Sequence, residues 1–252
     1  MSEAISSPKR KRLLVLYVSH VYNNRVKHFL ENAMFEDADI DWLFIYNGLA
    51  DTFPTPSYMK KLHRTNVGFD FGGWTDAIHH EDNKDKYDYY LFVNSSVFGP
   101  YLPADFTGKW TDIYVGGLKD NIRLFGSTIN TVGSPEWKSH VQSYIFCTDN
   151  EALQYLIQRG AFEKGKYPIT FQDAIWQREV PMSVYITQKG WNIGCTWKRF
   201  QGIDFTFRSI PFGRAPNHHL LVIDDMMYPQ YENNAWTREE LVFVKGNRLG
   251  IH

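Results

Sequence analysis

The sequence predicts an α/β fold: a single domain with a Rossmann-like, mostly parallel sheet and helices on both of its faces. Residues 13–18 (LLVLYV) form a continuous apolar run, which is typical of a strand buried on both faces of a parallel sheet. Helical periodicity follows at 25–32 (RVKHFLEN), and a second strand-like run stands at 41–46 (DWLFIY). Strand, helix and strand at this spacing indicate βαβ units, whose right-handed crossovers place the carboxyl ends of the strands along one edge.

The following stretch carries a glycine-rich turn between two further strands. Residues 62–65 form a short third strand, and three glycines then stand among large aromatic side chains at 68–73. Glycine lets the backbone pass close to a ligand or adopt positive φ. We expect a helix at 75–80 and a buried strand at 87–93 (YDYYLFV).

The second half of the chain has a less regular pattern. The expected strands are 112–116, 141–147 and 191–195, the expected helices are 150–159 and 174–189, and short apolar pieces stand at 218–223 and 241–245. Gly160 and Gly190 are placed to end the two helices. No repeat or linker divides the chain, so residues 13–252 are expected to form one domain that follows a disordered basic tail at 1–12.

The composition excludes several classes of protein. A net charge of -1 and a pI near 6.8 do not suit a broad nucleic-acid surface. No apolar run reaches the roughly 18 residues of a membrane span, and no signal peptide is visible. Cys147 and Cys195 are expected to be two buried thiols. These features predict a soluble, cytoplasmic protein.

Several familiar catalytic motifs are missing. The sequence has no GxxxxGK[ST] phosphate loop, no CxxC pair and no GxSxG nucleophile elbow. His79–His80 and His218–His219 are adjacent pairs, which do not have the i, i+4 spacing of zinc ligands on a helix. A dinucleotide-binding GxGxxG would follow the first strand, where Ser19 and His20 stand instead.

Polar side chains follow each of the first four predicted strands: Ser19, Asn47, Asn66 and Asn94. In α/β sheets, ligands usually bind at the carboxyl ends of the strands. The sequence therefore predicts a ligand site on this edge, although an ordinary βαβ connection with a glycine-rich loop would give the same spacing.

Five short segments carry a further resemblance. They are 66–73 (NVGFDFGG), 94–100 (NSSVFGP), 142–144 (QSY), 178–183 (REVPMS) and 244–248 (VKGNR). In this order they resemble nucleotide-sugar glycosyltransferases of the GT-A fold, with the nearest likeness to the rhamnan-synthesis F type and to the capsid-glycan glycosyltransferases of large algal viruses. The resemblance implies a GT-A-like domain, with a nucleotide-sugar half at 13–100 and an irregular acceptor half at 101–252.

The resemblance also implies an activity and its partners. The expected enzyme is an inverting glycosyltransferase of polysaccharide biosynthesis, which moves a sugar, such as xylose or rhamnose, from a UDP-linked donor to a hydroxyl of a glycan. A viral enzyme of this kind would work in the host cytoplasm. The donor-binding candidates are Ser19, His20, Asn66, Gly68, Asp70, Asn94, Ser95, Ser96, Lys245 and Arg248. Trp74, Trp176 and Trp197 are candidates for an acceptor platform, although most tryptophans belong to the core.

The sequence departs from most GT-A enzymes where their Asp-x-Asp pair binds a divalent ion. Here the strand ends in Asn94, Ser95 and Ser96, and neutral oxygens alone are poor ligands for such an ion. We therefore expect no tightly bound metal. Cations such as Lys245, Arg248, Arg208 or Arg214 would then neutralise the leaving diphosphate. The alternative is a weakly held manganese or magnesium ion, bound through Ser and Asn oxygens, water and the diphosphate.

Inverting transfer needs a base that takes the proton of the acceptor hydroxyl. The segment 178–183 is similar to the start of a helix in inverting GT-A enzymes, and this likeness assigns Glu179 as the base, with Asp173 in reserve. Without the likeness, Glu179 would be an ordinary carboxylate near a helix start. The missing Asp-x-Asp pair favours a second function, a non-catalytic protein that binds a carbohydrate or nucleotide sugar.

Overall fold

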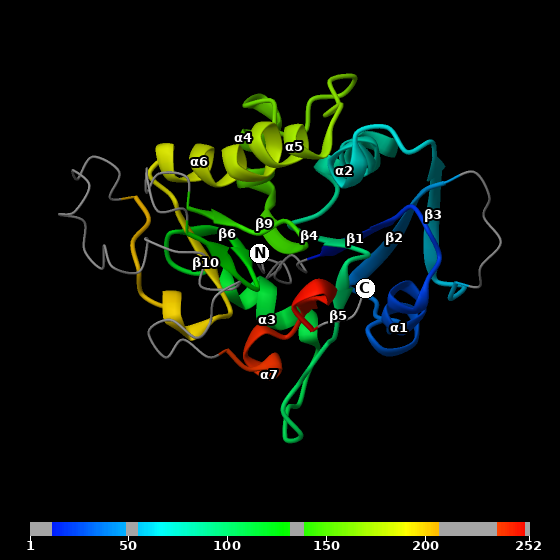
Figure 1. Cartoon of the computed structure of the whole chain (residues 1–252), viewed down its shortest axis with the longest axis horizontal. Coiled ribbons are helices and arrows are strands. Elements are labelled where there is room, and N and C mark those ends of the chain that lie inside the picture. Colours follow the sequence, from blue (N-terminus) through cyan, green and yellow to red (C-terminus); the bar gives the residue numbers. More distant parts are fainter. Residues whose placement is uncertain (1–11, 49–54, 132–138, 207–235, 250–252) are drawn as a thin grey trace, which may run out of the picture.

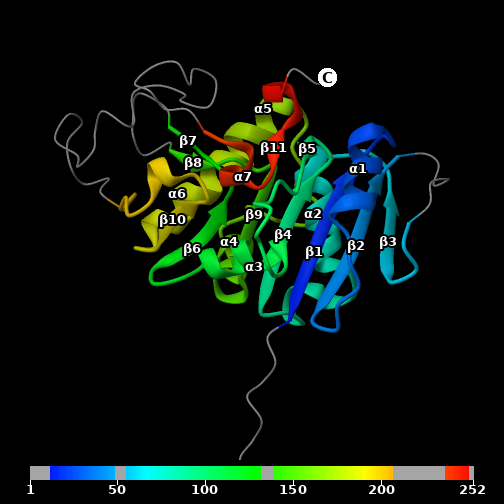
Figure 2. The same cartoon turned by 90° about the horizontal axis from the view of Figure 1, so that it is seen from below.

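The computed structural model describes residues 12–48, 55–131, 139–206 and 236–249 (Figure 1). A seven-stranded sheet runs through the domain in the order β10-β6-β9-β4-β1-β2-β3 (Figure 2). Its strands are β1 Leu13–Ser19, β2 Ile40–Asn47, β3 Met59–Arg64, β4 Tyr89–Asn94, β6 Ile122–Gly126, β9 Ile145–Asp149 and β10 Asn192–Cys195. Two small ladders lie outside it, β5 Val97–Phe98 with β11 Val244–Lys245 and β7 Ile129–Asn130 with β8 His140–Val141.

The sheet is mostly parallel, as the sequence predicted. Strand β1 pairs in parallel with β2 and β4, β3 pairs in parallel with β2, and β10 with β6. Only β9 runs the other way in this sheet, antiparallel to both β4 and β6. The segment before β9 therefore reaches the edge at which the parallel strands end.

Helices cover both faces of the sheet, and the α/β fold class is confirmed. The helices are α1 Asn24–Asn32, α2 Phe69–His79, α3 Trp110–Gly117, α4 Asn150–Gln158, α5 Phe171–Ala174, α6 Val180–Gln188 and α7 Arg238–Leu241. Figure 1 shows α2, α4, α5 and α6 on one face, and α1, α3 and α7 on the other. None of the helices in the described ranges is both long and apolar enough to cross a bilayer.

Strand β1 explains why the sheet is covered twice, because its side chains alternate between two cores. Leu14, Leu16 and Val18 belong to the core under α2, α4 and α6, while Tyr17 and its alternate neighbours pack with α1 and α3. The Tyr17 ring stacks on Phe29 of α1, with 4.1 Å between the ring centroids. A strand buried on both faces needs apolar residues at every position, which is the pattern of 13–18.

Two predicted elements were wrong in type or extent. Residues 112–116 are part of the helix α3, because the buried residues Trp110 and Tyr114 lie one turn apart and bury one face. The helix predicted at 75–80 begins at Phe69, so two of the three glycines lie inside α2. At Gly73 an added Cβ would lie 2.8 Å from Val18 Cγ2, which shows how closely α2 approaches the sheet.

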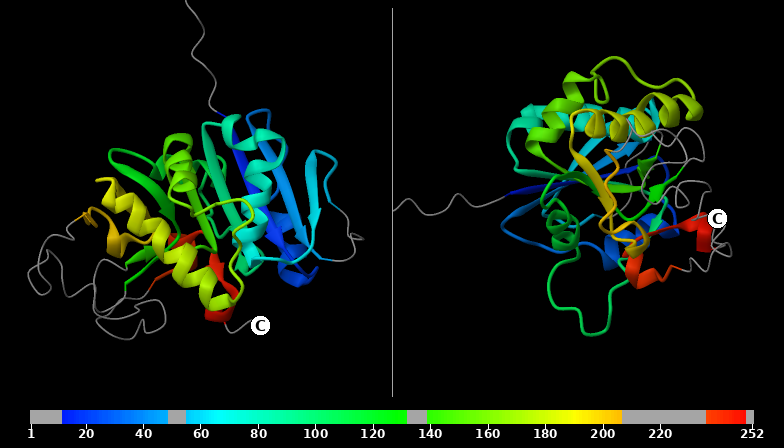
Figure 3. Two further views of the ribbon diagram at one scale, coloured as in Figure 1. Left: turned by 90° about the horizontal axis from the view of Figure 1, so that it is seen from above. Right: turned by 90° about the vertical axis from the view of Figure 1, so that its left-hand side faces the viewer.

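The predicted strand 141–147 is broken in two. Its ends belong to β8 and β9, and 142–144 between them face a cavity. The helix predicted at 174–189 begins earlier, and α5 continues into α6 through the π-helical turn Ile175–Glu179 (Figure 3). Pro181 has no N–H to donate to the preceding turn, which accounts for an irregular hydrogen-bond ladder at this point.

Other predictions agree with the structure or fall outside it. Gly160 and Gly190 follow α4 and α6 with φ of 85° and 89°, as expected of residues that end helices. Both cysteines are free and buried. The basic tail up to residue 11, the apolar piece 218–223 with its two histidines, Arg208 and Arg214 lie outside the described residues.

Candidate active site

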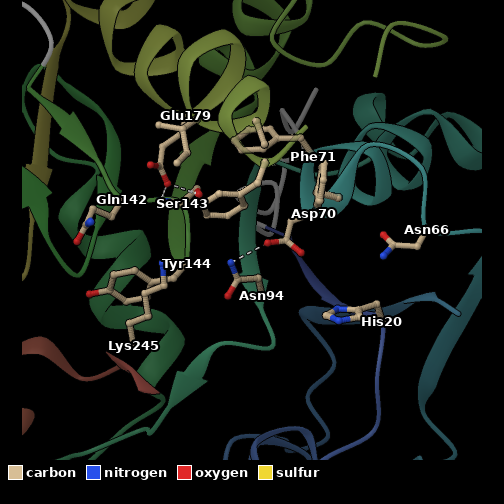
Figure 4. Close-up of a pocket in the computed structure, with 14 residues that line it drawn as sticks. His20, Asn66, Asp70, Phe71, Asn94, Gln142, Ser143, Tyr144, Glu179 and Lys245 are labelled. Atoms are coloured by element: carbon tan, nitrogen blue, oxygen red, sulfur yellow. Dashed lines mark hydrogen bonds between the residues drawn. The ribbon is translucent and has the colours of Figure 1, made fainter. Parts of the chain in front are cut away.

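A cavity of about 310 Å³ opens at the carboxyl edge of the sheet, where β4 and β9 meet (Figure 4). This volume is at the lower end of the range for small-molecule sites. The cavity is lined by His20, Asn66, Phe69, Asp70, Phe71, Asn94, Gln142, Ser143, Tyr144, Phe171, Ala174, Ile175, Glu179 and Lys245.

The turn before α2 brings Asp70 into this cavity. Gly68 and Phe69 both have positive φ, 80° and 55°, and such strain in a non-glycine residue is often found at functional sites. Asn47, at the end of β2, donates a hydrogen bond of 3.0 Å to the Phe69 carbonyl. The guanidinium of Arg64 bonds both the Asn47 side chain and the Val67 carbonyl. Polar groups at two strand ends thus hold the turn.

Asp70 lies in the first turn of α2 and faces the end of β4. Its Oδ2 accepts a hydrogen bond of 2.9 Å from Asn94 Nδ2. Burial raises the pKa of Asp70 to about 6, and the repulsion from Glu179 adds to this, while Asn94 and Lys245 oppose the shift. A carboxyl group that titrates near neutral pH is well suited to general acid–base chemistry.

Glu179 ends the π-helical turn and has a different environment. Its Oε2 accepts hydrogen bonds from the backbone N–H of Ser143, at 2.8 Å, and from the Ser143 hydroxyl. Nε2 of the buried His140 lies 3.5 Å from Oε1. Burial alone would raise the pKa of Glu179, but the His140 and Ser143 contacts outweigh it and hold the pKa well below its ordinary range.

Lys245 lines another wall of the cavity, and Arg248 lies beside that wall without lining it. Strand β11 pairs with β5 immediately after β4, and this places Lys245 opposite Val97. Burial lowers the pKa of Lys245, although Glu179 and Asp70 attract its charge. Arg248 Nη2 donates a 2.9 Å hydrogen bond to Gln142, whereas its buried Nε and Nη1 have no hydrogen-bond partner in the described part of the chain.

The structure sorts the predicted donor-binding residues into two groups. Those that line the cavity are His20, Asn66, Asp70, Asn94 and Lys245. Those that lie beside it without lining it are Ser19, Gly68, Ser95, Ser96 and Arg248. The Ser19 hydroxyl donates a hydrogen bond to the Val21 carbonyl, and Gly68 is the N-cap of α2, so both stabilise the backbone beside the cavity.

The structure places three other candidates, Asp173, Trp74 and Trp197, outside the cavity lining. Asp173 does not line the cavity: it forms a capping box with Thr170, and its second oxygen accepts a bond from Gln177. Trp74 is fully buried and donates a hydrogen bond to the Leu16 carbonyl, and Trp197 is 2% exposed. Core side chains of this kind cannot contact an acceptor. Trp176 is 49% exposed on the turn that leads to Glu179.

The end of β4, at Asn94, Ser95 and Ser96, carries no carboxylate of its own. Divalent ions normally keep a carboxylate among their oxygen ligands. Here Oδ1 of Asn94 is taken by the backbone N–H and hydroxyl of Ser96, and its amide nitrogen faces Asp70. Within the described ranges no group of three or more His, Cys, Asp or Glu could hold a metal.

The sequence did not reveal the wall formed by 140–144. The family resemblance includes 142–144 but assigns these residues no function, and no sequence pattern marks His140 as a site residue. Their place beside Glu179 depends on the direction of β9, because only a reversed strand brings its preceding loop to this edge.

The profile of the rhamnan synthesis protein F family matches residues 56–204, more than half of the chain. No curated protein matches significantly. Among solved structures, a CMP:2-keto-3-deoxy-manno-octonic acid synthetase complexed with CTP is similar, with a TM-score of 0.40 and 11% identity over 73% of this chain and 89% of that one. A glycosyltransferase involved in glycosylation of the major capsid of PBCV-1 has a TM-score of 0.37 and 13% identity over 66% and 75%. A197 from STIV has a TM-score of 0.33 and 10% identity, over 57% of this chain and 67% of that one.

Proposed function

We propose, since this chain belongs to the rhamnan synthesis protein F family, that it is a glycosyltransferase which moves a sugar from a nucleotide-sugar donor to a hydroxyl of a glycan. The observation that carries the proposal is the charge arrangement in the cavity. Two carboxylates, Asp70 and Glu179, share it with Lys245, and the unpaired N–H groups of Arg248 lie next to it. Figure 4 shows Glu179 above and Lys245 below, with Asp70 to their right beside Asn94.

This arrangement suits a substrate that carries a diphosphate on a sugar. The diphosphate would lie against Lys245 and Arg248, because charge-assisted hydrogen bonds to phosphate are strong and stabilise the leaving group. His20 and Asn66 would contact the nucleoside beyond it. No carboxylate other than Asp70 and Glu179 lines the cavity in the described ranges, so one of these two would take the acceptor proton.

The finer assignment follows the motifs. We propose a UDP-linked donor, xylose or rhamnose as the sugar, inversion at the anomeric carbon and a cytoplasmic site of action. The exposed ring of Trp176 would support the acceptor glycan, because a flat apolar face matches a pyranose ring. We propose that the reaction needs no tightly bound metal.

The alternative is a protein that binds a nucleotide sugar without transferring it. The neutral residues at the end of β4 favour it, because most GT-A enzymes have carboxylates there. Hydrolysis of the donor separates the two functions, since a transferase usually passes some sugar to water and a binding protein does not.

The test is to incubate the purified chain with UDP-, GDP- and dTDP-sugars, with and without EDTA, and to measure the released nucleotide by chromatography. We expect release from one donor, unaffected by EDTA. Release that stops in EDTA would restore a metal to the reaction. If no donor is cleaved but one raises the melting temperature, the binding function holds, and if neither occurs, the nucleotide-sugar proposal fails.

A further inference from the structure

We infer that Asp70, and not Glu179, accepts the proton of the attacking hydroxyl, and that Glu179 is a positioning residue for the wall that binds the diphosphate. The inference rests on the proposed function, since it assigns roles within that reaction. It reverses the assignment that the sequence motif suggested. Both oxygens of one carboxylate are held by the protein, while the other carboxylate keeps an oxygen free.

Glu179 has little capacity left to take a proton from a substrate. Ser143 donates two hydrogen bonds to Oε2, from its backbone N–H and its hydroxyl. His140 lies against Oε1, and the Glu179 side chain is 16% exposed. A carboxylate that accepts several hydrogen bonds is a weaker base, and the lowered pKa of Glu179 agrees with this.

The same contacts give Glu179 another task. They fix residues 142–144, the loop between β8 and β9, and these three residues line the cavity. Within that loop, Gln142 accepts the 2.9 Å hydrogen bond from Arg248, and the Tyr144 ring lies 5.9 Å from the same guanidinium. Glu179 thus acts through 142–144 on a cation that would meet the diphosphate.

Asp70 has the geometry that Glu179 lacks. Only Oδ2 is engaged, by Asn94, and Oδ1 has no hydrogen-bond partner among the described residues. The side chain lies in the cavity wall at the end of β4, and Asn94 fixes its orientation. A free carboxylate oxygen in a fixed position is what a general base requires.

The charges around Asp70 come from several elements. Glu179 on the π-helical turn repels its charge, and Lys245 on β11 attracts it. The Tyr17 hydroxyl on β1 interacts electrostatically with Asp70 and with Arg25 of α1. The exposed His20 lines the same cavity. Burial dominates and raises the pKa of Asp70 to about 6. Asp70 is therefore mostly ionised at pH 7 and is protonated as the pH falls below 6.

The step balances without another reactant. The acceptor oxygen forms a bond to the anomeric carbon, and the bond from that carbon to the diphosphate oxygen breaks, with its electron pair leaving on the nucleoside diphosphate. The proton of the acceptor hydroxyl passes to Asp70 Oδ1. Asp70 later releases this proton to solvent, which restores the carboxylate.

The test compares Asp70→Asn, Glu179→Gln and the control Asp112→Asn, an exposed carboxylate on α3. UDP-xylose and UDP-rhamnose serve as donors and water as the acceptor, between pH 5 and pH 9. UDP affinity is measured separately by calorimetry. We expect the wild type and Asp112→Asn to lose kcat/KM for the donor as the pH falls through about 6. Asp70→Asn should lower kcat by about 10²- to 10⁴-fold, remove this limb and still bind UDP.

Glu179→Gln should behave differently. It should raise the KM for the donor and weaken UDP binding while it keeps the acid limb, because Asp70 remains. Formate should partly restore turnover to Asp70→Ala and not to Glu179→Ala.

Two outcomes would overturn the inference. One is an Asp70→Asn variant that keeps its kcat and its acid limb. The other is a Glu179→Gln variant that loses kcat and the acid limb without any change in UDP affinity. If the wild type neither cleaves these donors nor binds UDP, the UDP-linked donor of the proposed function is wrong, and the assignment of Asp70, argued for that donor, falls with it.

Discussion

Asn94 Nδ2 donates a 2.9 Å hydrogen bond to Asp70 Oδ2 and so joins the carboxyl end of β4 to the first turn of α2. The bond connects two segments whose positions are fixed by the burial of β4 and by the backbone conformation of the turn before Asp70. Asn94 ends a buried central strand, and Asp70 follows a turn with two successive positive φ values. The carboxylate is therefore fixed in the cavity although its burial opposes ionisation.

Asp70 should reduce the stability of the protein at neutral pH. Its pKa is raised to about 6 in the folded state, so its contribution to folding is favourable below pH 4 and is lost as the pH rises through 6. We expect Asp70→Asn to increase the free energy of unfolding by about 1–3 kcal/mol at pH 8 and to change it little at pH 4. Urea unfolding at both pH values measures this. An equal effect at the two pH values would contradict the explanation.

Arg248 should strengthen donor binding, while its unpaired buried nitrogens should lower the stability of the unliganded protein. Its buried Nε and Nη1 lack partners among the described residues, and its charge beside the cavity would attract a diphosphate bound there. We expect Arg248→Met to weaken UDP binding about 10- to 100-fold, which corresponds to about 1.5–3 kcal/mol for hydrogen bonds to a charged group. The melting temperature of the unliganded protein should not fall. Lys60→Met, on the exposed side of β3, is the control and should bind UDP like the wild type.

Gly73 and Gly116 form a matched pair of helical glycines. A Cβ at Gly73 would lie 2.8 Å from Val18 Cγ2 and 3.1 Å from Asn47 Oδ1, while a Cβ at Gly116 would meet nothing within 4 Å. Gly73→Ala should destabilise the fold by about 1–3 kcal/mol because α2 must move away from the sheet. Gly116→Ala should stabilise α3 by up to about 1 kcal/mol. Chemical denaturation of both variants tests the difference, and equal effects would be inconsistent with the close packing of α2.

Trp176 and Trp74 should separate acceptor binding from folding. Trp176 is 49% exposed, whereas Trp74 is fully buried against Phe92 and Phe146. We expect Trp176→Ala to raise the KM for a glycan acceptor about 2- to 10-fold, the loss of one aromatic contact of about 0.5–1.5 kcal/mol. Trp74→Ala should instead cost about 3–5 kcal/mol of stability. Transfer kinetics with a soluble glycan and thermal unfolding measure the two effects. If Trp176→Ala leaves the acceptor KM unchanged, the platform lies elsewhere.

The sequence predicted the strands and the first helix well where burial alone decides the pattern. Residues 13–18 and 89–93 are apolar on both faces, and no other local structure suits them better. It failed at 112–116, where a helix with one buried face also contains β-branched residues, so that local propensity pointed to a strand. The early start of α2 was missed because Gly72 and Gly73 are poor helix formers, and close packing on the sheet outweighs that preference.

The cavity was predicted in part for a similar reason. Asn66 and Asn94 follow strands whose order could be inferred, whereas Asp70 and Lys245 were assigned by the family resemblance. The contact between Glu179 and Ser143 could not be inferred, because it depends on the reversed direction of β9. The hydrophobic pattern of a strand is the same in both directions, so the sequence alone did not show which end of β9 reaches the cavity.

The pairing of β5 with β11 has a consequence for how the cavity forms during synthesis. Val97 lies directly after the central strand, and its partner Lys245 is separated from it by more than half of the chain. A nascent chain that has emerged as far as β10 contains all seven strands of the main sheet and both carboxylates, but it lacks the lysine that faces them. Termination between residues 195 and 245 would therefore give a chain with all seven strands of the main sheet but without Lys245, and translation must pass this residue before the cavity is complete.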